Sequence, residues 1–419
     1  MGNLIKETIL SSSFKDSLLV MASSAVGSVL GFVFLSLLAR SVGAEQFGIY
    51  STITSYILFL STIVDLGINQ SLVKFVAQVK EEEKKKIITT SFYSVFISTI
   101  GLSLFFSLVY EFLLKKIWHY NDHYFFLIFI SIITFSLFVY FLAVFQSLKK
   151  FFQRSLVDIL YCILRLIFVA VLLYFFVFNV QNALIIVNFS YGLVFVLTLV
   201  LLKKFFIFPY FNREKWKSLI EFSKWFVPNN IFVNLFYKLD ILMLPAFLSA
   251  YQVGLYSAAA RFMIIFPLSI NSLIAVFSTR FSQFKNKEEC HHYLRSSLTI
   301  SALVFAVLAS LFLLGKYLIL FAYSSEFSAS VKIFQFLVLA YLPLILTVPF
   351  YNAIVYFYKK PQLMTLILGL QVLIFFILNL FFIPKQNFYG PIYSLFIVNT
   401  LTLFVEIGIY FGRKRKILY

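Results

Sequence analysis

Stretches of about 20 apolar residues follow one another along almost the whole chain, with only short polar segments between them. A helix of that length crosses the hydrocarbon layer of a membrane, whereas no soluble core could bury so many apolar stretches. Composition agrees, because 61% of the residues are apolar and only 12% are charged. The sequence therefore predicts an all-α polytopic membrane protein with about twelve spans, at residues 17–39, 47–68, 87–110, 124–146, 156–178, 183–202, 222–248, 252–277, 296–315, 331–357, 362–383 and 389–411.

The segment at residues 41–51 recurs 206 positions later at residues 247–257, with Ala, Gln, Gly, Tyr and Ser in matching register. Internal duplication of this kind is typical of transporters that expose one central site alternately to each side. We expect two six-helix lobes, residues 1–208 and 209–419, joined by the polar segment Lys203–Glu221. Because six is even, a pseudo-two-fold axis along the membrane normal should relate the lobes.

The repeated glycines and tyrosines suggest local roles. Gly48 and Gly254 open two predicted spans, where a missing side chain lets the preceding turn pack closely. Tyr50 and Tyr256 follow them and are expected at the membrane–water interface as aromatic anchors. Prolines inside predicted spans should interrupt helical hydrogen bonds and allow bends; they are Pro228, Pro245, Pro267, Pro343 and Pro349.

Basic residues predict the orientation. Twelve spans put both termini on one side, and 26 Lys and Arg residues fall in segments on that side against six on the other. By the positive-inside rule both termini are cytoplasmic, which suits a multi-pass protein of the cytoplasmic (inner) membrane. This dispersal over short loops accounts for the formal charge of +18, so nucleic acid is not an expected partner.

Four motifs together resemble a known family. They are the segment Leu38–Tyr50, the triplet Asp65-Leu66-Gly67, the triplet Lys238-Leu239-Asp240 and the segment Val253–Arg261. These residues resemble the polysaccharide-biosynthesis flippases of the multidrug/oligosaccharidyl-lipid/polysaccharide exporter superfamily, and the predicted twelve-span, two-lobe layout fits the whole chain. The motifs are packing and turn motifs, so they indicate the family better than the substrate.

The resemblance implies a V-shaped pair of helical bundles with a central cavity that opens alternately to each face. It implies export of a polyprenyl-pyrophosphate-linked oligosaccharide from the cytoplasmic to the outer leaflet, for assembly of a surface polysaccharide such as O-antigen or capsule. The implied partners are this substrate, membrane lipids, a polysaccharide polymerase and other assembly proteins, with a proton or sodium ion as a coupling ion left open. No cofactor is expected.

Charged residues deep in predicted spans are the first candidates for a site, because an ionisable group in hydrocarbon costs about 2.5–3.5 kcal/mol unless it faces a cavity or a partner. They are Arg165, Lys238, Asp240 and Arg261. In one interpretation Asp240 and Arg261 form a structural ion pair. In the other, Arg165, Lys238 and Arg261 line the central cavity and bind pyrophosphate, since Arg and Lys supply charge-assisted donors to phosphate oxygens.

Three further carboxylates are candidates for ion coupling. Asp65 and Asp158 lie near the cytoplasmic ends of their predicted spans, and Glu406 lies in the last span. Helix capping or gate contacts is the main interpretation of the first two, and the alternative for each of the three is a protonatable or sodium-binding group. Arg40, at the outer end of the first span, is expected to interact with lipid headgroups or to cap the turn, with a gate role as the alternative.

The sequence indicates neither a metal site nor catalytic residues. His119 and His123 are four apart, as metal ligands on a helix would be, with Asp122 beside them, but a short interfacial loop explains them. The chain contains no phosphate-binding glycine loop and no nucleophile-elbow motif, so hydrolysis of ATP by this chain is not expected.

Two other functions are alternatives to export of a lipid-linked sugar. A small-molecule antiporter of the same superfamily would need carboxylates and aromatic residues for an organic cation, whereas the deep charges here are mostly cationic. A membrane polysaccharide polymerase usually needs a sizeable outer loop with catalytic residues, and every predicted outer loop is short. We therefore expect a transporter and not an enzyme.

Overall fold

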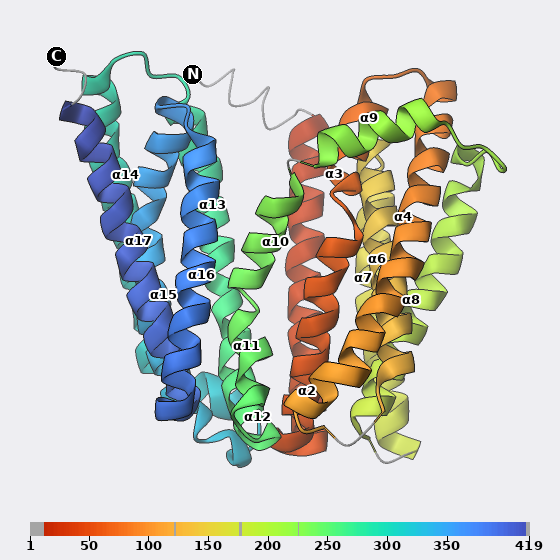
Figure 1. Cartoon of the computed structure of the whole chain (residues 1–419), viewed down its shortest axis with the longest axis horizontal. Helices are drawn as coiled ribbons and strands as arrows, with labels where there is room; N and C mark the ends of the chain where they lie inside the picture. The colour runs from red at the N-terminus through yellow and green to blue at the C-terminus, as the bar shows by residue number, and fades with distance from the viewer. Residues whose placement is uncertain (1–11, 121–122, 176–177, 225, 416–419) are drawn as a thin grey trace. The chain divides into compact units, whose positions relative to one another are not determined.

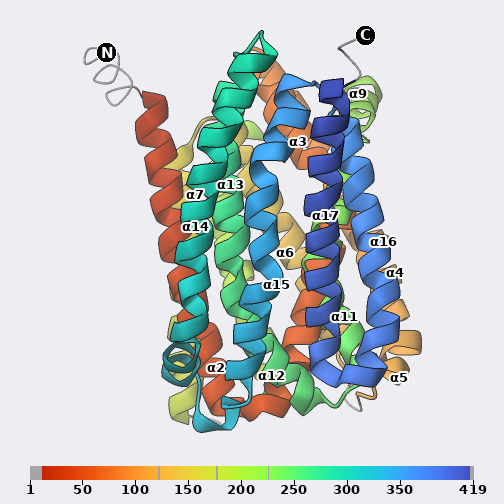
Figure 2. The same ribbon diagram turned by 90° about the vertical axis from the view of Figure 1, so that its left-hand side faces the viewer.

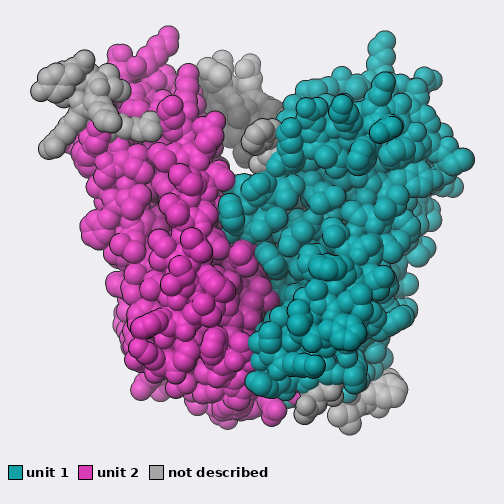
Figure 3. Space-filling model, in the orientation of Figure 1, with its two compact units in different colours: residues 1–42, 53–234 teal, residues 43–52, 235–419 magenta. Residues whose placement is uncertain are grey.

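A computed structural model describes residues 12–120, 123–175, 178–224 and 226–415, and the regular elements over these residues are helices (Figure 1). The chain divides into two compact units. Unit 1 comprises residues 1–42 and 53–234, and unit 2 comprises residues 43–52 and 235–419 (Figure 3). The predicted functional lobes 1–208 and 209–419 stay a proposal.

Within the described residues, nine helical stretches are long and apolar enough to cross a membrane, so the chain is a multi-pass membrane protein. Leu18–Val64 with 47 residues and Pro361–Gly412 with 52 residues are each long enough to contain two predicted spans. The predicted span 222–248 is broken, because Lys238 has a non-helical backbone with φ −127° and Pro245 lies in a 3-10 turn. The total of twelve stays a prediction. So does the orientation, since both chain ends, including Lys6 and Lys416, lie outside the described residues.

Helix α6 is the centre of unit 1. It packs against α3, α4, α7 and α8, while α9 packs across α3 and α4. Tyr140 of α6 is fully buried, and its hydroxyl donates to the backbone oxygen of Ile88 on α4 at 2.9 Å. The elements are α2 (Ser12–Val64, of which residues 43–52 belong to unit 2), α3 (Ile68–Ala77), α4 (Glu81–Val109), the π turn η1 (Tyr110–Leu114), α5 (Lys115–Ile117), α6 (Phe125–Ser147), α7 (Phe151–Phe175), α8 (Val180–Leu202), η2 (Lys203–Phe205), α9 (Arg213–Ser223) and α10 (Phe226–Phe236).

Small residues let the first part of α2 lie close to α7. Ser23, Gly27 and Gly31 are spaced by four, so they share one face of the helix. The hydroxyl of Ser23 donates to the hydroxyl of Ser155 at 3.0 Å. A Cβ atom at Gly31 would lie 3.2 Å from the Arg165 guanidinium, so the glycine makes room for that side chain.

Helix α15 is the centre of unit 2, with α12, α13, α14 and α17 packed around it. Figure 2 shows α14, α15, α17 and α16 side by side. Helix α12 passes into the 3-10 turn η4 just before Pro267, whose missing N–H opens the helical ladder there. The elements are α11 (Leu239–Met243), η3 (Leu244–Ala246), α12 (Ala250–Ala260), η4 (Arg261–Ile264), α13 (Ile265–Phe281), α14 (Lys287–Ala322), η5 (Ser325–Phe327), α15 (Ser330–Asn352), the π turn η6 (Ala353–Phe357), α16 (Pro361–Gln386), η7 (Asn387–Tyr389) and α17 (Gly390–Arg415).

The two copies of the repeated segment pack against each other within unit 2. A Cβ atom at Gly48 would lie 2.0 Å from the backbone oxygen of Ala250, and one at Gly254 would lie 1.8 Å from that of Ala44. No side chain fits at either distance, so each copy needs its glycine because the other copy's backbone lies there. The expected close packing at these glycines is therefore an approach of one repeat to the other.

The two copies use different caps at the start of their helices. Gly43 kinks α2 with φ 75°, and the N–H of Ala44 just after it donates to Oε1 of Glu326 at 2.8 Å. In the second copy, Ser249 and Gln252 form a capping box at the start of α12. A distant carboxylate thus replaces in one copy what a local side chain does in the other.

The expectation that Tyr50 and Tyr256 lie at the membrane interface is wrong. They are 3% and 0% exposed. The hydroxyl of Tyr256 donates to Oδ2 of Asp240 at 2.6 Å inside unit 2. A tyrosine in an apolar stretch fits either an interface or a buried polar partner, and for Tyr256 the partner is the buried carboxylate of Asp240.

Candidate functional site

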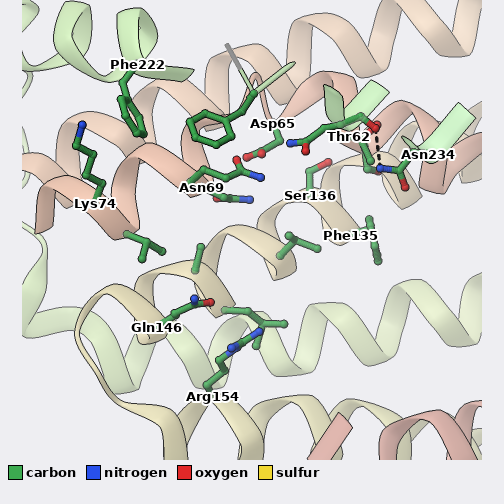
Figure 4. A pocket seen from close by; sticks show the side chains of 18 residues that line it. Thr62, Asp65, Asn69, Lys74, Phe135, Ser136, Gln146, Arg154, Phe222 and Asn234 are labelled. Carbon is green, nitrogen blue, oxygen red and sulfur yellow. Dashed lines mark hydrogen bonds between the residues drawn. The ribbon is translucent and has the colours of Figure 1, made fainter. Parts of the chain in front are cut away.

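A cavity of about 750 Å³ lies inside unit 1 (Figure 4). It is lined by residues of α2, α3, α6, α7, α9 and α10 and of the turn between α2 and α3. Phe135, Phe222 and Phe226 supply aromatic surface. The polar lining residues are Ser61, Thr62, Asp65, Asn69, Gln70, Lys74, Ser136, Gln146, Arg154, Asn230 and Asn234.

The turn at Asp65-Leu66-Gly67 shapes one wall of this cavity. Leu66 and Gly67 have φ values of 49° and 69°, so the chain leaves α2 at Val64 and starts a new helix at Ile68 instead of continuing the predicted span. Ser223 of α9 fixes the turn by donating to the backbone oxygen of Gly67 at 3.0 Å. The backbone N–H of Asn69 donates to the Asp65 carboxylate, a cap near the start of α3.

Three side-chain oxygens on this wall are buried and have no hydrogen-bond partner among the described residues. They are Oδ1 of Asp65, Oδ1 of Asn69 and Oε1 of Gln70. Asp65 and Asn69 point toward the cavity from neighbouring positions in Figure 4. Leaving a buried polar group without a partner costs about 1–3 kcal/mol. Water molecules, or a ligand with several hydrogen-bond donors, would satisfy these three oxygens.

Two cations line the same cavity. The Lys74 ammonium lies 3.7 Å from the centroid of the Phe222 ring, a cation–π contact. Arg154 lies in the first turn of α7, where the charge of Asp158, one turn later, acts on it. In Figure 4, Arg154 and Gln146 lie across the cavity from Asp65 and Asn69, and Lys74 lies at one end with Phe222.

The structure brings Lys238, Asp240 and Arg261 together in unit 2. Asp240 is 4% exposed, and its carboxylate accepts hydrogen bonds from the Tyr256 hydroxyl at 2.6 Å and the Ile241 N–H at 2.8 Å. The charge of Lys238 acts on both Asp240 and Arg261. The hydrogen bonds to Asp240 therefore come from Tyr256 and Ile241, and the predicted ion pair with Arg261 stays a prediction.

Arg165 belongs to unit 1 and is held by aromatic residues. Its guanidinium lies 4.2 Å from the ring centroid of Phe34 and 5.0 Å from that of Tyr161. One Nη atom also donates to the Tyr161 hydroxyl at 3.1 Å. Aromatic contacts and a hydroxyl thus fix the orientation of the guanidinium half-buried in the helix bundle.

Asp158, Glu406 and Arg40 are the remaining predicted residues. Asp158 lies on α7, with one carboxylate oxygen 4.0 Å from the position of a Cβ at Gly27. Glu406 of α17 is 4% exposed, and its Oε2 has no hydrogen-bond partner in the part of the chain that the structure describes. Arg40 is exposed on α2. Coupling by these carboxylates and a gate role for Arg40 stay proposals.

The histidines of the predicted outer loop are not arranged as helical metal ligands. His119 has a positive φ of 55°. Nδ1 of His123 lies 2.7 Å from Oε1 of Glu111. Asp122 lies outside the described residues, and among those that are described no three His, Cys, Asp or Glu side chains form a group that could hold a metal ion.

The family model for polysaccharide biosynthesis proteins matches residues 13–285, which is most of the chain. The chain belongs to this family. No curated protein matches the sequence at a significant level.

Solved structures share the fold of this polysaccharide biosynthesis protein. The lipid II flippase MurJ in an inward closed conformation aligns with a TM-score of 0.74 at 15% identity, over 93% of this chain and 87% of MurJ. An inward-facing multidrug resistance MATE transporter of the MOP superfamily aligns with a TM-score of 0.71 at 12% identity, over 94% and 98%. A MOP superfamily transporter from Pyrococcus furiosus, whose binding pocket is described as having reverse polarity, aligns with a TM-score of 0.62 at 13% identity. The alignment covers 95% of this chain and 94% of that transporter.

Sequence reasoning about this family member found Asp65 but missed most of the residues around it. Asn69, Gln70 and Gln146 are uncharged, so a search for ionisable groups in apolar spans passes over them. Lys74 and Arg154 fall in or beside predicted cytoplasmic loops, where basic residues are expected, so they do not stand out. The pair Asn69-Gln70, directly after the Asp-Leu-Gly turn in an apolar region, is the one signal that could have drawn attention to this wall.

Proposed function

We propose that this protein is a flippase that moves a polyprenyl-pyrophosphate-linked oligosaccharide from the cytoplasmic to the outer leaflet of the cytoplasmic membrane. The observation that carries the proposal is the polar cavity of about 750 Å³ among apolar, membrane-length helices. A sugar has many hydroxyls, and each one without a partner in hydrocarbon costs several kcal/mol. Polar walls that replace the hydrogen bonds of water would lower that barrier.

The family supports a saccharide substrate. The matching model describes polysaccharide biosynthesis proteins, and one structure of the same fold is a lipid II flippase. The fold alone does not choose between lipid-linked sugars and drugs, because MATE transporters share it. The family match is therefore what favours a lipid-linked saccharide over a multidrug substrate.

The deep cations are proposed to bind pyrophosphate as the cavity opens alternately to each side. Arg165 presents a guanidinium whose orientation is fixed by Phe34 and Tyr161. Lys238 and Arg261 lie within electrostatic range of each other, and this repulsion would fall when an anion binds near both. Protons or sodium ions acting through Asp65, Asp158, Asp240 or Glu406 are the proposed coupling ions.

The test is outward movement of a fluorescent polyprenyl-pyrophosphate oligosaccharide in proteoliposomes. The native chain is compared with Arg165→Ala, Arg261→Ala and the control Arg295→Ala, an exposed arginine of α14, at equal amounts of folded protein. We expect flipping by the native chain and the control. The two deep-arginine variants should lose most of it, because a charge-assisted hydrogen bond to phosphate is worth about 1.5–3 kcal/mol.

The outcomes separate the parts of the proposal. Flipping that persists in both folded variants would keep the flippase and reduce the arginines to structural residues. No flipping by the native chain, together with export of an organic cation, would favour the drug antiporter. Activity on the lipid-linked sugar in detergent, where no compartments exist, would indicate an enzyme.

A further inference from the structure

The unit 1 cavity places anion-binding and hydroxyl-binding groups in one space. Lys74 and Arg154 are its two cations, while Asp65, Asn69 and Gln70 contribute the buried oxygens without partners. In Figure 4 the cations come from different walls, with Asp65 and Asn69 beside the space between them. A ligand that carries both a negative charge and several hydrogen-bond donors would match both kinds of group.

The acceptors distinguish a sugar from a simple anion. The oxygens of Asp65, Asn69 and Gln70 would repel phosphate oxygens at short range, but they accept hydrogen bonds from hydroxyl groups. Phe135, Phe222 and Phe226 add apolar faces on which a sugar ring can pack. The volume lies within the usual range of small-ligand sites, about 300–1,000 Å³, so it suits the head-group end of a lipid-linked sugar rather than a long oligosaccharide.

The place of the cavity along the chain suits loading from the cytoplasm. Lys74 begins the basic segment 74–86, and Arg154 follows Lys149 and Lys150. Both segments are cytoplasmic in the predicted topology. A charged head group coming from the cytoplasmic leaflet would therefore meet these cations at the cytoplasmic end of the helices.

We propose that the unit 1 cavity is the loading site for the head group, where Lys74 and Arg154 bind the diphosphate and Asp65, Asn69 and Gln70 accept hydrogen bonds from hydroxyls of the first sugar. This inference rests on the proposed function. It assigns parts of the substrate to residues other than the deep cations Arg165, Lys238 and Arg261. The deep cations would receive the diphosphate in a later step of the same cycle.

The experiment measures affinity in detergent for farnesyl diphosphate and for farnesyl diphosphate linked to glucose, galactose or N-acetylglucosamine. In the native protein at least one sugar should raise the affinity about tenfold over farnesyl diphosphate. Asn69→Leu and Gln70→Leu should abolish this increment and change the affinity for unglycosylated farnesyl diphosphate by less than about twofold. Gln70→Glu, which keeps an acceptor oxygen, should retain the increment.

Arg154→Gln should weaken both ligands by about tenfold, because it removes a donor to the diphosphate. The matched controls are Gln78→Leu, an exposed amide just beyond α3, and Arg213→Gln, an exposed arginine of α9. Both should bind like the native chain. Gel-filtration profiles and thermal unfolding would establish that each variant is folded.

Failure of this inference can be told from failure of the proposed function. If the native chain flips the lipid-linked oligosaccharide but the sugar increment is absent, or survives in the leucine variants, the loading site is wrong and the flippase stands. If the native chain neither binds these ligands nor flips the substrate, the proposed function fails and the loading site fails with it.

Discussion

Asp240 is a buried carboxylate among the predicted site residues, and Tyr256 is the side chain that donates a hydrogen bond to it. The Tyr256 hydroxyl donates to the carboxylate at 2.6 Å, and both residues are buried. Tyr256→Phe removes the hydrogen bond but keeps the ring. We expect it to lower the free energy of unfolding by about 1–3 kcal/mol, measured as a lower midpoint of thermal unfolding in detergent.

Tyr251→Phe is the matched control, since Tyr251 lies on the same helix and is 43% exposed. It should leave the midpoint unchanged. Equal midpoints for the native chain and Tyr256→Phe would mean that Asp240 finds another donor. The predicted ion pair with Arg261 would then be the better account of this carboxylate.

At the scale of residues, charge was predictable from the sequence and environment was not. Arg165, Lys238 and Arg261 stand out because charged side chains are rare in apolar stretches. Their neighbours do not stand out: Phe34 lies 131 positions before the arginine whose guanidinium it contacts. The amides of the unit 1 cavity are invisible to a search for charge, because only the fold shows that their oxygens are buried.

The two repeated segments cross each other at Gly48 and Gly254. At this crossing the structure requires glycine at both positions. At Gly48 and Gly254 the other copy's backbone oxygen occupies the place of a Cβ atom. Gly48→Ala or Gly254→Ala must therefore push the two segments apart. We expect each to cost about 3 kcal/mol or more, measured by thermal unfolding and by the yield of monodisperse protein.

Gly408→Ala serves as the control, because Gly408 lies in helix α17 of the same unit with no atom within 4 Å of its Cβ position. Alanine favours a helix over glycine by roughly 0.5–1 kcal/mol, so this variant should match or exceed the native stability. Native-like stability of Gly48→Ala would contradict the close crossing.

Elements were predictable where apolar length alone defines them. The predicted spans 124–146 and 331–357 correspond closely to α6 and α15. Prediction was poorer where polar turns break the pattern. The segment Lys203–Glu221 was expected only as a linker, but it contains most of helix α9 (Arg213–Ser223). Leu219 and Ser223 of that helix are buried. Apolar periodicity over 11 residues is a weak signal beside membrane spans twice as long.

At the scale of the molecule, the duplication seen in the sequence is visible as two segments in mutual contact rather than as two separate halves. Residues 43–52 pack with unit 2 although they belong to the first half of the chain. The first copy of the repeat therefore packs against the second copy, which lies in the other half of the sequence. A transport cycle that moves the predicted lobes would have to preserve or open this glycine crossing, which makes it a place where helix motion is constrained.

The charge of the proposed substrate predicts a dependence on membrane potential. The pyrophosphate is anionic, so an inside-negative potential favours its outward movement by about 2.3 kcal/mol per charge per 100 mV, less any counter-charge that moves with it. That energy corresponds to roughly a fiftyfold change in the equilibrium distribution for each charge.

Proteoliposomes with potassium gradients and valinomycin would set the potential inside-negative, zero or inside-positive. Outward flipping of the fluorescent oligosaccharide lipid should be fastest at inside-negative potential and slowest at inside-positive potential. Equal rates at all three potentials would mean that a counter-ion neutralises the moving charge, and the buried carboxylates Asp65 and Glu406 would become the first residues to change.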